Sequence, residues 1–187
     1  MTARTQRART LPERIGAIAT ALDRVPHAFG GALALAYYAE PRATVDIDLN
    51  VFVPASRADA VTRPLQRLGV DVADPVARSS ITRDGQGRLM WDTTPIDLFF
   101  AYDPFHDAAG AARQRVPFAD TQIWILAPEH LVVCKVVFDR PRDWVDVDAM
   151  LEAEVALDVA EVLRWVGRIA GDDDPRYDRI ASVLTHR

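Results

Sequence analysis

Cysteine and lysine are almost absent from this sequence, which has one of each among its 187 residues. The single cysteine, Cys134, excludes an internal disulfide, and its apolar neighbours predict a buried thiol that behaves as a small hydrophobic side chain. Of the 22 lysine and arginine residues, all but Lys135 are arginines. Because an ammonium and a guanidinium are not interchangeable, we expect this lysine at a position that arginine would not serve.

Long apolar runs are absent as well. No uninterrupted apolar segment approaches the roughly 20 residues that cross a bilayer, so no membrane partner is expected. The arginine-rich residues 1–9 are not followed by an apolar segment, so we expect neither a signal peptide nor an anchor, and a cytoplasmic location. The four histidines lack the spacing of metal ligands, which argues against a zinc site.

What is present is the composition of a globular protein, with 49% hydrophobic and 26% charged residues. The length suits one domain with an appended subdomain. Residues 139–187 account for the whole net charge of -5, because they hold 12 acidic and 7 basic side chains. The larger part of the chain is therefore neutral overall and compatible with local basic patches that contact nucleic acid.

Apolar periodicity and breaking residues predict an α+β fold, in which a mixed sheet flanked by helices is followed by a helical subdomain. The predicted strands cover 27–29, 46–53, 95–102 and 122–126, and a hairpin is predicted over 81–91. The predicted helices cover 11–24, 32–39, 57–68, 128–138, 143–154, 157–170 and 175–185. We expect an α/β domain over residues 1–127 and a helical C-terminal subdomain over residues 128–187.

Two aspartates, Asp46 and Asp48, lie in one predicted strand. Side chains alternate along a strand, so both carboxylates project from one face, while Ile47 and Leu49 face the core. Like charges this close repel unless a cation lies between them, and Mg²⁺ (or Mn²⁺) prefers such oxygen ligands. Asp97 brings a third carboxylate in another apolar strand, which would join the pair if the two strands are neighbours. The alternative is a chance pair of acids on an exposed strand.

A glycine pair, Gly30-Gly31, separates the predicted strand 27–29 from the predicted helix 32–39. Glycines let the backbone come close to a phosphate, and the helix behind them offers free N–H groups and the positive end of its dipole. The alternative is a plain tight turn. Together with the carboxylates, the pair predicts a site in which metal ions join acidic side chains to a triphosphate.

The segments Phe29-Gly30-Gly31, Asp46-Ile47-Asp48-Leu49 and Ile96-Asp97-Leu98 resemble the motif of the DNA polymerase beta-type nucleotidyltransferase superfamily. Segments 30–35 and 42–49 are similar in particular to the AbiEii and MenT toxins of bacterial toxin–antitoxin pairs, with Ala32 and Thr44 in place of the usual Thr and Ser. The resemblance implies the nucleotidyltransferase fold. It also implies catalysis and metal binding by Asp46, Asp48 and Asp97, and nucleotide binding by Gly30, Gly31 and Thr44.

The resemblance continues through Lys135 and the run Arg142-Asp143-x-x-Asp146. It implies that Lys135 contacts the NTP phosphates and that Asp143 supports catalysis from the helical subdomain. A compact ammonium suits a triphosphate, although a surface lysine is the alternative. Asp143 equally fits the cap of a helix, and Asp146 and Asp148 are predicted to be solvated.

The resemblance further implies transfer of NMP from an NTP to the 3′ acceptor end of tRNA, which would block aminoacylation and translation, and a cognate antitoxin protein as partner. Alternatives are transfer to a small molecule, as in aminoglycoside nucleotidyltransferases, transfer to a protein side chain, and a non-catalytic NTP-binding module. Candidate phosphate contacts on RNA are Arg4, Arg7, Arg9, Arg78, Arg83, Arg88, Arg113 and Arg115.

Overall fold

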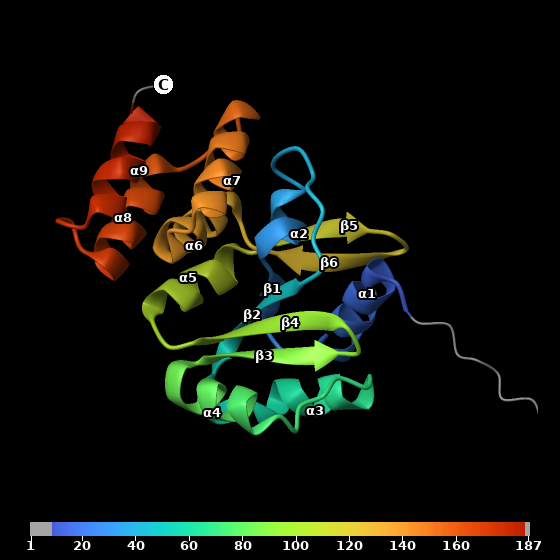
Figure 1. Cartoon of the computed structure of the whole chain (residues 1–187). Coiled ribbons are helices and arrows are strands. Elements are labelled where there is room, and N and C mark those ends of the chain that lie inside the picture. Colours follow the sequence, from blue (N-terminus) through green and yellow to red (C-terminus); the bar gives the residue numbers. More distant parts are fainter. Residues whose placement is uncertain (1–8, 186–187) are drawn as a thin grey trace, which may run out of the picture.

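A computed structural model describes residues 9–185, which form a six-stranded mixed sheet flanked by helices (Figure 1). The predicted contacts Arg4 and Arg7 lie outside the described residues. The strand order is β3-β4-β2-β1-β6-β5, in which β2 runs parallel to β4 and β1 runs parallel to β6. The strands are β1 (His27–Phe29), β2 (Ile47–Pro54), β3 (Gln86–Trp91), β4 (Thr94–Ala101), β5 (Gln114–Phe118) and β6 (Thr121–Ile125). The predicted mixed sheet with flanking helices is confirmed.

The helices begin and end at residues that satisfy their free backbone groups. Thr10 and Glu13 form a capping box at the start of α1, and prolines open α4 to α7 and α9, where a missing N–H costs nothing. The helices are α1 (Leu11–Ala21), α2 (Gly31–Leu35), the 3₁₀ turn η1 (Ala55–Arg57), α3 (Asp59–Arg67), α4 (Pro75–Asp84), α5 (Pro104–Ala112), α6 (Pro128–Phe138), α7 (Pro141–Glu152), α8 (Val159–Ala170) and α9 (Pro175–Thr185).

The two faces of the sheet have different surroundings. Along β2 the residues from Ile47 to Val53 alternate between buried and half-buried, and the buried set faces the hydrophobic core. On the core side, α4 packs so closely on β3 that a Cβ at Gly87 would overlap Ile81. Helices α6 to α9 gather on the other side of the sheet from α3 and α4 (Figure 1). The half-buried side chains of β2 and β4 therefore face the C-terminal helices.

The predicted hairpin over 81–91 is wrong in its first arm, because Ile81 lies in α4. The Asp74 carboxylate accepts a hydrogen bond from the Val76 N–H at the start of this helix. Gly85 ends the helix with a φ of 68°, a left-handed conformation that suits glycine. The hairpin of the structure joins β3 to β4 one strand later, around Asp92, which also has a positive φ.

The remaining differences concern short elements and helix ends. Helix α5 and strand β5 were not predicted, and α2 has five residues, fewer than the predicted helix over 32–39. The hydrophobic core is continuous from the sheet into α6 to α9. The division of the chain after residue 127 stays a prediction.

Candidate active site

Strands β2 and β4 place two of the predicted carboxylates side by side. Asp48 on β2 is in register with Asp97 on β4, one strand away in the sheet. Asp46 immediately precedes β2, two residues from Asp48. The structure thus brings Asp46, Asp48 and Asp97 to the face of the sheet that looks toward the C-terminal helices.

The electrostatics of this acidic group centre on Asp48. Burial raises the pKa of Asp48 to about 6, and the neighbouring charges of Asp46 and Asp97 contribute to this rise. Burial also acts to raise the pKa of Asp46, but the hydrogen bond that the Thr44 hydroxyl donates to its carboxylate helps to hold that pKa below its usual value. Thr44, a predicted nucleotide contact, is therefore a partner of Asp46 in this structure.

The third carboxylate already has a cationic partner. Arg88 on β3 donates two hydrogen bonds to Asp97, at 2.6 and 2.7 Å. Within residues 9–185 no three acidic, histidine or cysteine side chains are grouped closely enough to hold a metal ion. The donor set nevertheless fits a hard divalent cation, because a buried carboxylate between two like charges gains from a cation with oxygen preference. Asp97 would have to exchange Arg88 for the cation.

The glycine turn lies directly against Asp48. Gly31 has a φ of 51°, and a Cβ at this position would overlap the Asp48 carboxylate. The Gly30 N–H donates a hydrogen bond to the Asp48 carbonyl oxygen at 3.0 Å, which ties the turn to β2. Because α2 has only five residues, its dipole is weaker than the predicted longer helix would supply. The close approach of backbone to carboxylate is what requires glycine here.

Replacing Gly31 by alanine is expected to lower kcat/KM for the nucleotidyl transfer that the sequence resemblance implies by about a hundredfold or more. The added methyl group would displace the Asp48 carboxylate. The matched control is Gly69→Ala, at a glycine that also has a positive φ, of 97°, but no atom closer than 3.8 Å to the new Cβ. Both variants should lose roughly 1 kcal/mol of stability from the left-handed backbone. Initial rates and thermal melts check this, and equal activity in the two variants would contradict it.

Lys135 is buried in a network of ion pairs. Its Nζ lies 2.5 Å from an Asp146 oxygen and 3.9 Å from an Asp143 oxygen. Arg42, in the loop that leads to Asp46, donates two further hydrogen bonds to Asp146 at 2.8 and 2.9 Å. The prediction that Asp146 is solvated is therefore wrong, since this residue is 2% exposed and joins α6, α7 and the loop before β2. Asp148, by contrast, is exposed as predicted.

Asp143 contributes to the start of α7 and also faces the cleft. Its carboxylate accepts hydrogen bonds from the Arg140 side chain and from the Arg140 backbone N–H, which caps the helix. It also lines the same cleft as Asp48 and Lys135. The helix-cap interpretation and a place beside the candidate site are thus compatible.

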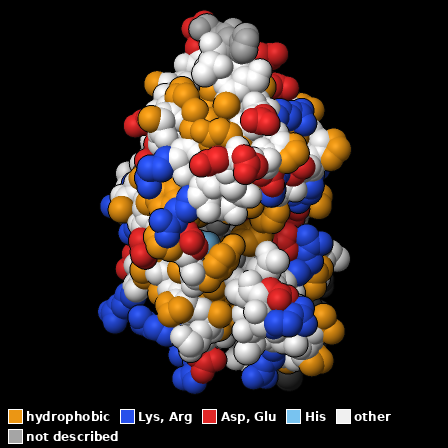
Figure 2. Space-filling view, turned by 90° about the vertical axis from the view of Figure 1, so that its left-hand side faces the viewer, with side chains coloured by type: hydrophobic (Ala, Val, Ile, Leu, Met, Phe, Trp, Pro, Cys, Tyr) orange, Lys and Arg blue, Asp and Glu red, His pale blue; other side chains and the backbone are white. Residues whose placement is uncertain are grey.

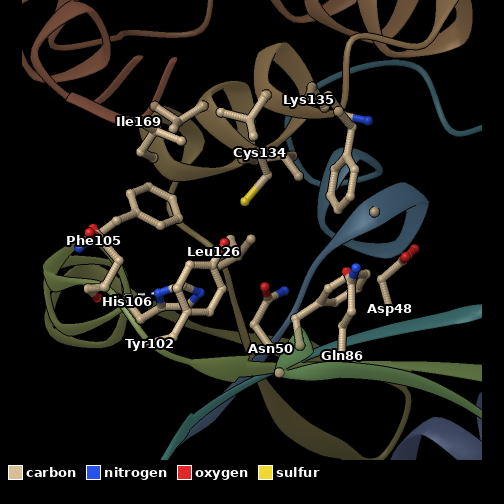
Figure 3. Close-up of a pocket in the computed structure, with 18 of the residues that line it drawn as sticks. Asp48, Asn50, Gln86, Tyr102, Phe105, His106, Leu126, Cys134, Lys135 and Ile169 are labelled. Carbon is tan, nitrogen blue, oxygen red and sulfur yellow. Dashed lines mark hydrogen bonds between the residues drawn. The ribbon is translucent and has the colours of Figure 1, made fainter. Parts of the chain in front are cut away.

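A cleft of about 500 Å³ runs from Asp48 and Gly31 toward Tyr102 and Phe105, between the sheet and α6. In Figure 3 the Asp48 and Lys135 side chains lie at one end and the Tyr102, Phe105 and His106 rings at the other. Figure 2 shows a hollow on this side of the molecule with hydrophobic side chains around it. The volume is that of a small-molecule or nucleotide site.

Cys134 packs against the hydrophobic core but also lies at this cleft, so it is less buried than the sequence predicts. It is half-buried and lines the cavity wall, where burial raises the pKa of its thiol to about 12. A thiol with so high a pKa remains protonated near neutral pH and is a poor nucleophile.

The predicted RNA-contacting arginines are spread over the surface. Arg83 pairs with Asp84, and Arg88 is the one of these arginines that reaches the acidic group. Arg113 and Arg115 lie over the Trp124 ring of β6, near the opposite edge of the sheet from β3, which carries Arg88. The structure does not gather these arginines into one patch among the described residues.

The family described as "Nucleotidyl transferase AbiEii toxin, Type IV TA system" matches residues 16–184. The chain belongs to the AbiEii toxin family. As a member of this family it is a nucleotidyltransferase toxin, and its toxin–antitoxin system implies an antitoxin partner. No curated protein matches the sequence.

Comparison with solved structures identifies the fold of this chain. The solution structure of the antibiotic-resistance factor ANT(2'')-Ia is 17% identical, with a TM-score of 0.60 over 92% of this chain and 96% of that chain. A crystal structure of ANT(2'')-Ia in complex with adenylyl-2''-tobramycin is 16% identical, with a TM-score of 0.60 over 95% of this chain and 100% of that chain. The AbiEii-family chain therefore has the nucleotidyltransferase fold.

No helix within residues 9–185 is both long and apolar enough to cross a membrane. The cytoplasmic location stays a prediction. Nucleotidyltransferases use NTP substrates and usually divalent metals, which agrees with the chemistry of the carboxylates on β2 and β4.

Proposed function

We propose that this AbiEii-family protein transfers a nucleoside monophosphate from an NTP to the 3′ acceptor end of tRNA, with Mg²⁺ or Mn²⁺ held by Asp46, Asp48 and Asp97. A tRNA extended in this way is no substrate for aminoacylation, so translation stops. The observation that carries the proposal is the acidic group whose central member, Asp48, lies against the Gly30-Gly31 turn and lines a cleft that Lys135 also lines.

The mouth of the cleft supports a single-stranded acceptor. Tyr102 is 78% exposed, and the centroid of its ring lies 4.7 Å from that of the His106 ring. Arg168, half-exposed at the end of α8, lines the same cleft. Unpaired RNA ends are bound by stacking of bases on aromatic rings and by cations near the phosphates, and this mouth offers both.

In the proposed reaction, the terminal hydroxyl of the acceptor attacks the α-phosphorus in line. A new P–O bond forms as the bond to pyrophosphate breaks, and Asp97 accepts the hydroxyl proton. Lys135 offsets negative charge on the phosphates from the α6 side of the cleft, where Asp143 and Asp146 orient it. A divalent cation on the three carboxylates, when bound, supplies stabilisation of charge at the phosphoryl oxygens.

The exposed Arg88–Asp97 pair is compatible with this role. The Arg88 side chain is 59% exposed, and ion pairs at such surfaces contribute little to stability, roughly 0–1 kcal/mol. Asp97 therefore exchanges partners at small cost. Asp48, without a cationic partner at hydrogen-bond distance among the described residues, has the strongest need for a cation.

The proposal is tested by incubating the protein with each of four labelled NTPs, Mg²⁺ and total tRNA. We expect label in tRNA and an increase in mass by whole nucleotides at the 3′ end. Oxidation of the terminal ribose with periodate removes the acceptor hydroxyls and should abolish labelling. Label that appears only in an added aminoglycoside, or only in protein, would instead identify a small-molecule or side-chain acceptor and refute the tRNA assignment.

A further inference from the structure

The register of β2, β3 and β4 aligns two rows of side chains across the cleft floor. The first row is Arg88–Asp97–Asp48, the charged row described above. The second row, two residues further along each strand, is Gln86–Phe99–Asn50. Residues two apart in a strand share a face, so the two rows lie on one face of the sheet, about 7 Å apart. Asp48 from the first row and all three residues of the second row line the cleft. An aromatic ring flanked by two carboxamides thus lies next to the carboxylates.

Both carboxamides of the second row are available to a ligand. Within the described part of the chain, neither the Asn50 nor the Gln86 side chain has a hydrogen-bond partner. Both point into the cleft in Figure 3, where Asn50 lies between Asp48 and Tyr102. Asn50 is also the only asparagine of the sequence. Asn50 is half-buried, so its unpaired amide forgoes the hydrogen bonds that a bound polar ligand would supply, whereas the exposed Gln86 amide is free to turn toward such a ligand.

Asn50 is held next to the glycine turn. A Cβ at Gly30 would lie 2.7 Å from its Nδ2, so the absence of a side chain at Gly30 leaves the space that the Asn50 amide occupies. The glycine pair thereby serves both rows: Gly31 makes room for Asp48, and Gly30 makes room for Asn50. This shared dependence links the position of the amide to that of the catalytic carboxylate.

Phe99 supplies the apolar part of the row. Its ring lines the cleft and packs edge to face on the Phe138 ring at the end of α6, with the two ring centroids 5.6 Å apart. Phe138 is 45% exposed and lines the same cleft from the helical side. The row therefore has an aromatic surface of two rings and a polar group on each side of Phe99. A planar ring with hydrogen-bonding edges, such as a nucleobase, fits this chemistry.

We infer that the Gln86–Phe99–Asn50 row binds the nucleoside of the incoming NTP and selects among the bases. The inference rests on the proposed function for the place of the triphosphate, which Asp48, Gly31 and Lys135 would hold. Two residues along a strand span about 7 Å, which places the row within reach of the ribose and base of a nucleotide whose phosphates lie at the carboxylates. The amides then hydrogen-bond to polar edges of the nucleoside, while Phe99 contacts its face.

The incoming nucleoside fits this row better than the acceptor does. Asn50 and Gln86 lie between Asp48 and Tyr102 in Figure 3, whereas the exposed Tyr102 ring, tilted against the buried His106 ring, lies at the mouth itself. An acceptor that is part of a large RNA reaches the carboxylates from the open side. A free nucleotide is small enough to occupy the part of the cleft that the half-buried Asn50 and Phe99 line.

The test measures equilibrium binding of ATP, CTP, GTP and UTP, each with Mg²⁺ and without tRNA, by calorimetry. The wild-type chain is expected to prefer one NTP. Asn50→Ala and Gln86→Ala should each weaken the preferred NTP by roughly tenfold while changing the others less, because one ligand-specific hydrogen bond is lost. The matched control is Gln122→Ala, an exposed glutamine on β6 outside the cleft, which should leave all four affinities unchanged.

Unchanged ratios among the four NTPs in both cleft variants, with folding intact by circular dichroism, would overturn the inference. Equal loss for all four NTPs would also overturn it, because the amides would then contribute no base selection. The assay needs no acceptor, so its outcome is independent of whether tRNA is the substrate. A chain that binds NTPs selectively but labels no tRNA refutes the proposed acceptor and leaves the nucleoside row standing.

Discussion

Replacement of Asp48 by asparagine is expected to reduce nucleotidyl transfer by about 10³-fold or more. Asparagine keeps the shape of the side chain against Gly31 but removes the charge that would bind a divalent cation between Asp46 and Asp97. Initial rates with a labelled NTP at saturating Mg²⁺ measure the effect. The loss should appear in kcat, since the missing charge matters most as charge develops on the leaving pyrophosphate.

Stability separates this loss from misfolding. Burial and the charges of Asp46 and Asp97 raise the pKa of Asp48, so the ionised side chain is unfavourable in the folded state. Asp48→Asn should therefore melt at the same temperature as the wild type or higher, as active-site residues often cost stability. Asp59→Asn, an exposed aspartate on α3, is the control and should retain full activity. A fully active Asp48→Asn enzyme would refute the proposed catalytic group.

Replacement of Asp146 by alanine is expected to lower the free energy of unfolding by about 3–5 kcal/mol. The variant leaves the Lys135 ammonium, which is 4% exposed, without its closest partner, and it releases Arg42 from the loop before Asp46. Removing one member of a buried ion pair costs more than the pair contributes, because the other charge remains buried. Urea denaturation followed by tryptophan fluorescence measures the change in midpoint.

The matched control is Asp148→Ala, two residues further along the same helix, where the side chain is exposed. It should change stability by no more than roughly 0.5 kcal/mol. If the two variants unfold at the same denaturant concentration, the ion-pair network contributes nothing to the fold. A stable but inactive Asp146→Ala would instead mean that the network acts on the site alone.

The sequence predicted the fold well where local signals were strong. The helices over 128–138 and 175–185 begin and end at the predicted residues, because prolines and a buried apolar pattern mark them. It failed at Ile81-Thr82, where β-branched residues favoured a strand. The Asp74-Pro75 start and the Gly85 end of α4 are helix signals of equal strength, and packing of α4 on β3 decided between them.

For the site, the sequence predicts which side chains of one strand share a face, but not which strands are neighbours. Strand alternation put Asp46 and Asp48 on one face, and the register then set Asp97 beside Asp48, as expected if the strands were neighbours. The second row was missed, since Gln86, Phe99 and Asn50 become adjacent only once three strands are aligned. The sequence does not indicate the burial of Asp146, because its two cationic partners are 11 and 104 residues away along the chain.

The burial of Lys135 has a practical consequence for handling the protein. Its ε-amine is the only one in the sequence, and Asp146 and Asp143 surround it at a site that is 4% exposed. Acylating reagents that couple dyes or resins to surface amines will therefore find no lysine to attack on the folded chain. Lysine-linked tags of the kind that mark proteins for degradation meet the same obstacle until the chain unfolds.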